Sequence, residues 1–217
     1  KINGIEWIRL HYAYPLNFPT EILDVMKAFP QYCHYLDIPI QHISDEILQS
    51  MRRGGSSKYI YDLMAEIREA IPDIALRTTL ISGYPTETKA QHQELVDFVK
   101  KTRFERLGVF SYSQEEGTPA FPLGDPIKKS EKNRRLNELM TLQEQISLEL
   151  NEAKINTTQK VIIDREDAEY YVGRTQYDSP DVDNNVLIAK NVPLKVGEFY
   201  NIKITKAAEY DLFGEKI

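Results

Sequence analysis

Apolar residues recur with two different spacings along the first 110 residues of the chain. Short runs rich in β-branched and aromatic residues predict β-strands, and the stretches between them carry an apolar residue every three or four positions, which predicts helices. The predicted strands cover residues 6–12, 34–39, 74–81 and 107–111. Strands that alternate with helices at this spacing form parallel sheets with right-handed crossovers. Because the four predicted units are too few for a closed eight-stranded barrel, the pattern predicts an open α/β sheet or part of a barrel.

The pattern changes after residue 110. A crossing rich in proline and glycine covers residues 117–126, and a long helix is predicted from about Ser130 to Asn156. Its narrow apolar stripe could support a coiled coil, but the polar Gln143 within the stripe favours packing along the flank of a domain. From Thr157 onward about five short strands follow, which predicts a small barrel of the oligonucleotide/oligosaccharide-binding type. The sequence therefore predicts two domains, residues 1–156 and residues 157–217.

Composition restricts the classes of protein to which the chain can belong. Its 217 residues are 41% hydrophobic, enough for a packed core and too much for a disordered chain. The longest apolar runs fall far short of the ~20 residues of a membrane-spanning helix, so no membrane segment is expected. The single cysteine, Cys33, excludes an internal disulfide framework and a metal site built only from cysteines of this chain, and it fits a reducing, cytoplasmic setting. Because position 1 is lysine and not methionine, we expect the chain to be a fragment of a longer protein.

Polar residues gather where the predicted strands end. Asp37, Gln41 and His42 follow the second strand and could hold a ribose or an amino acid, although His42 could equally satisfy a loop carbonyl. The third strand runs into Ser82-Gly-Tyr-Pro85, where Gly83 either allows a ligand close to the backbone or forms an ordinary turn. Parallel sheets bind ligands at the carboxyl ends of their strands. The sequence therefore predicts a ligand site at this edge of the sheet.

Other polar features do not define a reaction by themselves. Arg52-Arg53-Gly54-Gly55 could bind an anion, because a guanidinium group binds a carboxylate with two hydrogen bonds, or could be a solvated helix end. Cys33 is more readily explained as a small buried hydrophobe than as a nucleophile. The histidines lack the spacing of a metal site, and the sequence contains no phosphate-binding Gly-x-x-x-x-Gly-Lys loop.

Several segments, taken together and in order, resemble a known family, the radical S-adenosylmethionine methylthiotransferases. These segments are Trp7–Pro15, Leu36–Asp45, Met51–Gly54, Arg77–Thr88 and Gly108–Ala120. In the tail, Gly173–Asp183 and Glu209–Gly214 resemble the small TRAM domain of the branch that modifies ribosomal protein S-twelve. The resemblance spans essentially the whole chain.

This resemblance implies a partial radical S-adenosylmethionine (β/α) barrel, with about the last four of six strands, followed by the long helix and a small TRAM barrel. It implies an enzyme that adds a methylthio group to the β-carbon of an aspartate in ribosomal protein S-twelve. The implied cofactors are S-adenosylmethionine and two 4Fe-4S clusters, whose cysteine ligands this sequence lacks. Because a cluster needs thiolate ligands, the chain alone is expected to be inactive.

The resemblance also implies which residues contact the cofactor. Gln41 and His42 would lie beside its ribose or its amino-acid end, and Arg77 would approach its carboxylate. The remaining residues fall in the segments that resemble the fifth-strand glycine motif and the adenine side of the family's site. They are Gly83, Glu87, Val109, Phe110 and Tyr112.

Two alternatives are a transfer-RNA-modifying member of the same family and a non-catalytic module that binds the ribosomal protein. Gln41-His42 resembles the ribosomal branch, whereas the transfer-RNA branch usually has Gln-Ser-Gly in this loop. Residues 158–217 contain 8 Lys and Arg against 11 Asp and Glu. Since a nucleic-acid-binding barrel needs a basic groove, the acidic tail favours a basic partner such as ribosomal protein S-twelve, or simply supports solubility.

Overall fold

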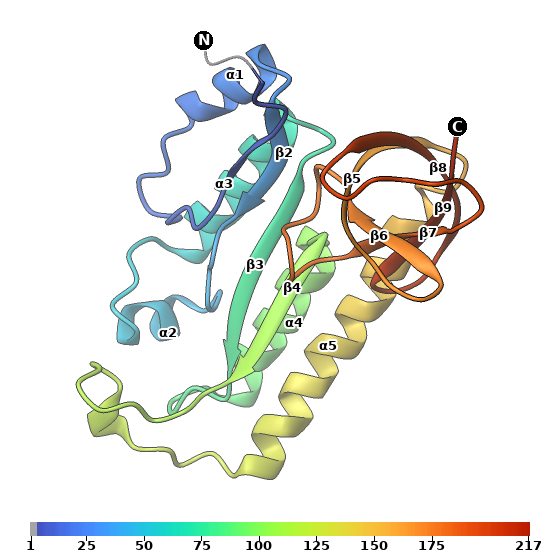
Figure 1. Cartoon of the computed structure of the whole chain (residues 1–217). Helices are drawn as coiled ribbons and strands as arrows, with labels where there is room; N and C mark the ends of the chain where they lie inside the picture. Colours follow the sequence, from blue (N-terminus) through green and yellow to red (C-terminus); the bar gives the residue numbers. More distant parts are fainter. Residues whose placement is uncertain (1–3) are drawn as a thin grey trace.

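The computed structural model describes residues 4–217, so the first three residues of the predicted domain 1–156 lie outside the described part. The centre of this part is a parallel sheet with the strand order β1–β2–β3–β4. The strands are β1 (Ile8–Leu10), β2 (Tyr32–Asp37), β3 (Ala75–Ser82) and β4 (Arg106–Ser111). The helices between them are α1 (Glu21–Ala28), α2 (Asp45–Ser50), α3 (Ser57–Ala70) and α4 (Lys89–Thr102). The predicted alternation of parallel strands and helices is confirmed (Figure 1).

Helices cover one face of this sheet. The apolar positions of α3 and α4 recur at steps of three and four, as amphipathic helices require. They bury Ile60, Leu63, Met64 and Ile67 from α3, and Leu95, Val96, Phe98 and Val99 from α4. The first strand is shorter than the predicted residues 6–12, because the backbone leaves the extended conformation at Tyr12, whose φ is 61°.

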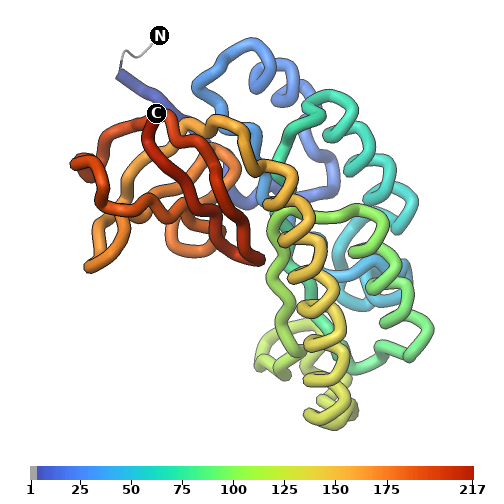
Figure 2. The backbone as a smooth tube through the Cα atoms, turned by 90° about the vertical axis from the view of Figure 1, so that its right-hand side faces the viewer, coloured from blue at the N-terminus to red at the C-terminus, as the bar shows by residue number. Residues whose placement is uncertain are grey.

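Helix α5 (Lys129–Glu152) follows a short 3-10 turn, η1 (Phe121–Leu123), and runs along the length of the first domain (Figure 2). Leu139 and Ile146 from its apolar stripe enter the core between the helix and the sheet. Gln143, the polar member of the stripe, donates through Nε2 to the Phe104 carbonyl at 2.8 Å. The helix therefore packs along the flank of the domain. Within residues 4–217, no helix combines the length and the apolar character needed to cross a membrane.

The remaining strands form a closed barrel in the order β5–β6–β7–β9–β8. They are β5 (Thr158–Glu166), β6 (Tyr170–Arg174), β7 (Asn185–Ala189), β8 (Phe199–Ala207) and β9 (Asp211–Lys216). Glycine is required at Gly173, because a Cβ there would lie 2.4 Å from the Ile162 carbonyl oxygen of the neighbouring strand. The predicted small five-stranded barrel is confirmed, and the boundary predicted before residue 157 falls between α5 and β5.

The loop between β6 and β7, residues 175–184, is called the interface loop here because it packs the small barrel onto the first domain. Arg106, at the start of β4, donates through Nε and Nη2 to one carboxylate oxygen of Asp178. Both side chains are buried, with 5% of Arg106 and 1% of Asp178 exposed. The other oxygen of Asp178 accepts a hydrogen bond from the Thr175 hydroxyl at 2.6 Å.

A second set of contacts extends this interface across the open face of the sheet. Arg77 of β3 donates to Asp183 at 3.2 Å, and the other oxygen of Asp183 accepts from the Tyr35 hydroxyl at 2.8 Å. These partners lie near the beginnings of β3 and β4, so the small barrel sits at the end of the sheet opposite to the carboxyl ends of the strands (Figure 1).

Replacing Asp178 by asparagine is expected to lower the free energy of unfolding by about 3–5 kcal/mol, because Arg106 is then a buried charge without its counter-ion. Urea unfolding followed by circular dichroism measures this loss. Asp181→Asn is the matched control, since Asp181 belongs to the same loop, is exposed and forms no ion pair among the described residues. An equal loss in both variants would contradict a special role of the buried pair.

Candidate functional site

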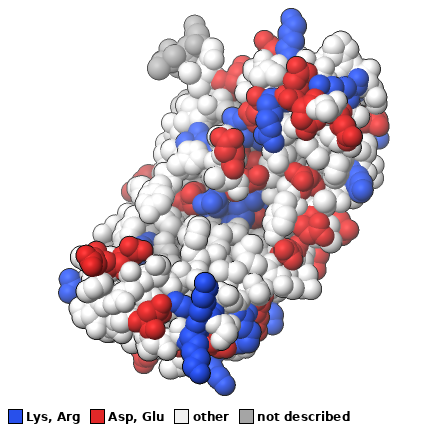
Figure 3. All heavy atoms as spheres, turned by 60° about the horizontal axis from the view of Figure 1, so that its bottom comes forward, with Lys and Arg blue, Asp and Glu red and all other residues white. Residues whose placement is uncertain are grey.

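A cavity of about 370 Å³ opens at the carboxyl ends of the parallel strands. Aromatic and apolar side chains form part of its wall and polar side chains form the rest. Its lining residues include Gln41, Arg53, Ile81, Tyr84, Phe110 and Tyr112. Figure 3 turns this end of the molecule toward the viewer and shows acidic and basic residues interspersed among broad uncharged areas. The mixed wall suits a ligand that has both a flat apolar part and polar groups.

The backbone of Gln41 holds this residue at the cavity. Its N–H donates to the Thr79 carbonyl at 2.9 Å, and its carbonyl accepts from the Ile81 N–H at 2.8 Å. These bonds fix a left-handed backbone, with φ of 73°. The side-chain Oε1 is buried and has no hydrogen-bond partner among the described residues. Because an unsatisfied buried acceptor costs about 1–3 kcal/mol, a ligand hydroxyl or amine that donates to this oxygen would be favoured.

Aromatic residues from β4 and from the turn after β3 form the apolar part of the wall. Phe110 is 61% exposed, which is unusual for a side chain of its size. Tyr84 and Tyr112 are mostly buried and pack edge to face, with ring centroids 5.5 Å apart. Such a surface can bind a planar ring by stacking or edge contact.

Glu87 lies behind this wall. It is 4% exposed and accepts hydrogen bonds from the Gly83 N–H at 2.8 Å and from Arg135 Nη1 at 2.6 Å. His42 Nε2 lies 3.5 Å from one of its oxygens and His92 Nδ1 lies 3.6 Å from the other. Burial alone would raise the pKa of Glu87, but the two imidazoles and the guanidinium outweigh it and hold that pKa well below its usual range. Glu87 therefore stays charged and fixes the turn after β3.

His42, the second residue of the predicted pair Gln41-His42, does not line the cavity. His42 is completely buried, and its Nδ1 accepts a hydrogen bond from the Ser44 N–H at 3.0 Å. The structure therefore brings His42 and Glu87 together in one buried network, separate from Gln41.

The space beside Gly83 is filled by another side chain of the protein. Its φ is 77°, and a Cβ at this position would lie 2.4 Å from Cγ of Lys132. Lys132 Nζ donates to the Tyr112 carbonyl at 2.9 Å and to Asp125 at 2.6 Å. The close approach that the sequence suggested at Gly83 is made by a side chain of α5, which ties that helix to the loop after β4.

Two other predicted residues do not line the cavity. Val109 is 9% exposed and belongs to the core beneath the helices. Arg77 lies about 16 Å before the end of β3 and pairs with Asp37 and Asp183, each at 3.2 Å. Of the predicted cofactor residues, the structure thus brings Gln41, Phe110 and Tyr112 to the cavity. The assignment of the whole set to a cofactor stays a prediction.

Some residues of the wall were not among the predicted cofactor residues. Met51, Tyr84 and the segment Thr118–Ala120 line the cavity. Tyr84 carried a usable signal, because it belongs to the strand-end segment Ser82–Pro85 and follows the end of β3 by two residues. Spacing gave no signal for Thr118–Ala120, because a crossing rich in proline and glycine does not reveal where it folds back.

The described residues contain no group of three or more His, Cys, Asp or Glu that could hold a metal ion. Cys33 is 1% exposed, and burial raises the pKa of its thiol. It packs with Tyr35 and Ala75 as a small hydrophobe, as the sequence suggested.

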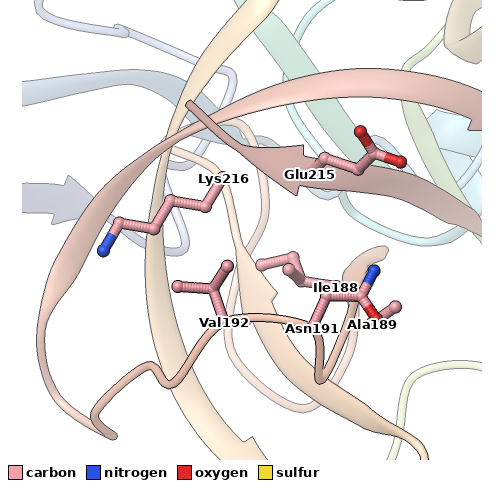
Figure 4. A pocket seen from close by; sticks show the side chains of 6 residues that line it. All are labelled: Ile188, Ala189, Asn191, Val192, Glu215 and Lys216. Atoms are coloured by element: carbon pink, nitrogen blue, oxygen red, sulfur yellow. The ribbon is translucent and has the colours of Figure 1, made fainter.

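A smaller cavity of about 180 Å³ lies in the small barrel (Figure 4). Ile188 and Val192 form its apolar part, and Glu215 and Lys216 border it from β9. None of its lining residues has a buried polar atom without a partner, and its volume lies below the roughly 300 Å³ at which ligand pockets usually begin. The cavity at the carboxyl ends of the parallel strands, with its aromatic wall and the unpartnered Gln41 Oε1, is therefore the candidate functional site.

Comparison with protein families defines the class of this protein. Residues 1–99 match the model of the Radical SAM superfamily, and residues 155–217 match the model of the TRAM domain. The chain thus combines a radical S-adenosylmethionine domain with a TRAM domain.

Curated relatives narrow this class. The chain is 54% identical over its full length to a protein of Christiangramia forsetii and 52% identical over 99% of its length to one of Flavobacterium johnsoniae. Both are named ribosomal protein uS12 methylthiotransferase RimO. The chain is thus similar over essentially its whole length to radical S-adenosylmethionine methylthiotransferases, which confirms the resemblance seen in the sequence. It spans about half the length of these relatives, 48% and 49% respectively.

A solved structure supports the fold of the first domain. The coproporphyrinogen III oxidase HemN of Escherichia coli, described as a radical SAM enzyme, is 21% identical in sequence and has a TM-score of 0.54. The match covers 64% of this chain and 32% of HemN. At this identity the likeness shows a shared fold alone.

Replacing Glu87 by glutamine is expected to lower the free energy of unfolding by about 3 kcal/mol near neutral pH, because Arg135 loses its buried counter-charge. The folded state lowers the pKa of Glu87, so its contribution is complete above the ordinary value of about 4.3 and declines as the pH falls below it. The difference between the wild type and Glu87→Gln should therefore shrink below about pH 4. Urea unfolding at a series of pH values measures this difference.

Glu94→Gln is the control for this series. Glu94 is exposed on α4, the helix that follows Glu87, and forms no ion pair among the described residues. Its substitution should change the unfolding free energy little at any pH. A Glu87→Gln difference that stays constant from pH 7 to pH 3 would rule out a charged Glu87 as the source of the stability.

Proposed function

We propose that this chain is part of a methylthiotransferase that adds a methylthio group to the β-carbon of an aspartate in ribosomal protein S-twelve. The observation that carries the proposal is its identity of 49–54% over essentially its whole length to relatives named as uS12 methylthiotransferases. The cavity at the carboxyl ends of the strands supports it, because ligands of parallel α/β folds bind at that edge. A ribosomal protein as substrate would place the reaction in the cytoplasm.

The residues of the cavity fit S-adenosylmethionine, which contains an adenine ring, a ribose and an amino-acid group. Ile81 and Phe110 offer apolar surface to the ring. The buried Gln41 Oε1, which has no partner among the described residues, offers an acceptor to a ribose hydroxyl. The volume of about 370 Å³ falls within the usual range of ligand sites, about 300–1,000 Å³.

The residues present do not fit a 4Fe-4S cluster. Such a cluster needs several thiolates, and the only cysteine of the sequence is buried in a core. Any cluster of the proposed enzyme must therefore be held by residues outside this chain. We infer that the 217-residue chain does not catalyse the reaction alone.

Reductive cleavage of bound S-adenosylmethionine, with the electron coming from a 4Fe-4S cluster held outside this chain, would supply the carbon radical that removes a hydrogen atom from the substrate. The residues of this chain bind and orient the molecule. Gln41 Oε1 would accept a hydrogen bond from a ribose hydroxyl, and Phe110 and Tyr84 would cover the ring and exclude water. Glu87 contributes indirectly. Its carboxylate accepts a hydrogen bond from the Gly83 N–H and so keeps the turn that carries Tyr84 in place.

The charge of the small barrel is weaker support for a ribosomal protein as partner than the number of acidic residues in its sequence suggests. Two of the 11 carboxylates in residues 158–217, Asp178 and Asp183, are engaged by arginines of the first domain. Nine carboxylates then face eight cations, so the outer surface is close to neutral. The names of the relatives, more than net charge, favour the ribosomal protein over transfer RNA.

The catalytic proposal predicts a mass change on the substrate. The test uses a longer protein, in which this chain is joined to the part of the relatives' sequence that it does not cover. After reconstitution with iron and sulfide under anaerobic conditions, this longer protein is expected to modify an S-twelve loop peptide. Mass spectrometry should detect one added methylthio group on the aspartate. The 217-residue chain treated identically is the control and should add none. An unmodified peptide after verified cluster loading would contradict the proposal.

The partner proposal predicts that exposed carboxylates of the small barrel contribute to docking. Replacing Glu169, Glu198 and Glu209 by glutamine should weaken binding of ribosomal protein S-twelve and reduce its dependence on salt, because exposed charges act at long range. None of the three forms an ion pair among residues 4–217. Surface plasmon resonance at several salt concentrations measures both effects.

The matched control replaces Glu66, Glu69 and Glu94, which are exposed carboxylates of the first domain. This triple variant changes the net charge of the chain by the same amount. If both triple variants weaken binding equally, overall charge explains docking and the small barrel has no special role.

A further inference from the structure

The interdomain cavity, of about 120 Å³, lies where the small barrel meets the first domain. Its wall includes Gln143 of α5, Gly108 of β4, Asn184 at the end of the interface loop and Tyr210 between β8 and β9. The volume is below the roughly 300 Å³ at which pockets for whole ligands usually begin. It is nevertheless large enough for several water molecules, and therefore for the few heavy atoms at the end of one side chain.

Two buried polar atoms of residues in this wall have no hydrogen-bond partner among residues 4–217. They are Oε1 of Gln143, which is an acceptor, and Nδ2 of Asn184, which is a donor. The two residues are only 2% and 5% exposed. Gln143 Nε2 is already engaged, because it donates to the Phe104 carbonyl. Since buried polar groups in proteins are nearly always paired, a donor and an acceptor left over in one cavity indicate a polar partner that binds there.

The charged side chains of the cavity wall are already neutralised. Arg77 and Arg106 are paired with carboxylates of the interface loop, and Glu105 is paired with Arg68. An ion that entered the cavity would therefore meet no unpaired charge of opposite sign on these residues, and burying it would be costly. A neutral group that offers one donor and one acceptor matches the two free atoms. A carboxamide has this composition, and it ends the side chains of asparagine and glutamine.

The surroundings of the cavity indicate that such a side chain belongs to a protein. Val182 and Tyr210 belong to its wall and are 62% and 46% exposed. Apolar and aromatic surface next to a buried polar contact is typical of protein interfaces. Gly108 belongs to this wall, and Phe110, two residues further along the same face of β4, lines the candidate functional site. A protein seated here would therefore reach toward the candidate site.

We propose that the interdomain cavity binds the carboxamide side chain of an asparagine or glutamine that a protein partner presents. Gln143 Oε1 accepts a hydrogen bond from the amide nitrogen of the partner, and Asn184 Nδ2 donates to its amide oxygen. Val182 and Tyr210 contact the segment that carries this side chain. The identity of the partner as ribosomal protein S-twelve rests on the proposed function.

Propanamide, which ends in the same carboxamide, is the probe for this site. Its addition to the nitrogen-15-labelled 217-residue chain should shift the side-chain NH₂ signals of Gln143 and Asn184 in nuclear magnetic resonance spectra. Propanoate is the matched control. It has the same size but carries a charge and no donor, so it should shift neither signal. If propanamide moves these signals no more than propanoate does, the cavity holds water only and the proposal is overturned.

Asn184→Asp replaces the free donor by an acceptor at nearly constant volume. It should abolish the propanamide shift at Gln143 and weaken binding of ribosomal protein S-twelve about tenfold in surface plasmon resonance, the usual loss for a hydrogen bond. Asn201→Asp is the control, since Asn201 is exposed on β8 and lies outside the cavity wall. It makes the same change of charge and should keep the affinity within about twofold. Equal losses in both variants would overturn the role of the cavity in docking.

The two measurements separate this inference from the proposed function. The propanamide titration needs no substrate, cofactor or cluster, so its failure overturns the amide site and leaves the proposed function untouched. A chain that binds propanamide but not ribosomal protein S-twelve would contradict that partner and would support the amide site.

Discussion

The buried ion pair between Arg106 and Asp178 determines how the two domains are joined. At 5% and 1% exposure, neither charge can be satisfied by water unless the domains separate completely. The contact between Arg77 and Asp183 extends the same join along the open face of the sheet. Because both arginines lie near the starts of their strands, the small barrel covers that end of the sheet. The carboxyl ends remain open, and the candidate cavity forms there.

The fold was largely predictable because its elements are encoded locally. Hydrophobic spacing reports which face of a helix or strand is buried, so the parallel strands, the flank packing of α5 and the five-stranded barrel all followed from periodicity. The contacts of the interface loop could not be predicted from periodicity. Asp178 and Asp183 lie 72 and 106 residues from their arginine partners. In the sequence they look like ordinary acidic loop residues, and their contacts require the assembled tertiary structure.

The candidate site was predictable only in part, for a related reason. The rule that ligands bind at strand ends located Gln41, and the family resemblance pointed to Phe110 and Tyr112, all of which line the cavity. A motif, however, does not distinguish a residue that contacts a ligand from one that holds the contacting loop. Glu87 illustrates this point: it follows Gly83 by four positions, and its carboxylate turns back to bind the Gly83 N–H and the buried Arg135. Arg53 lines the cavity, but the two adjacent arginines in the sequence gave no indication of which one faces it.

Helix α5 connects the cavity to the small barrel. Near its beginning, Lys132 donates to the Tyr112 carbonyl beside the cavity. Near its end, Ser147 and Asn151 donate to the carbonyls of Glu209 and Ala208 in the small barrel. The distance along the helix from Lys132 to Asn151 is about 28 Å at 1.5 Å per residue. A substrate held by the small barrel while it reacts at the cavity must bridge this distance. A small molecule is too short to do so, whereas a folded protein with a protruding loop is long enough, and this geometry is what a macromolecular substrate would require.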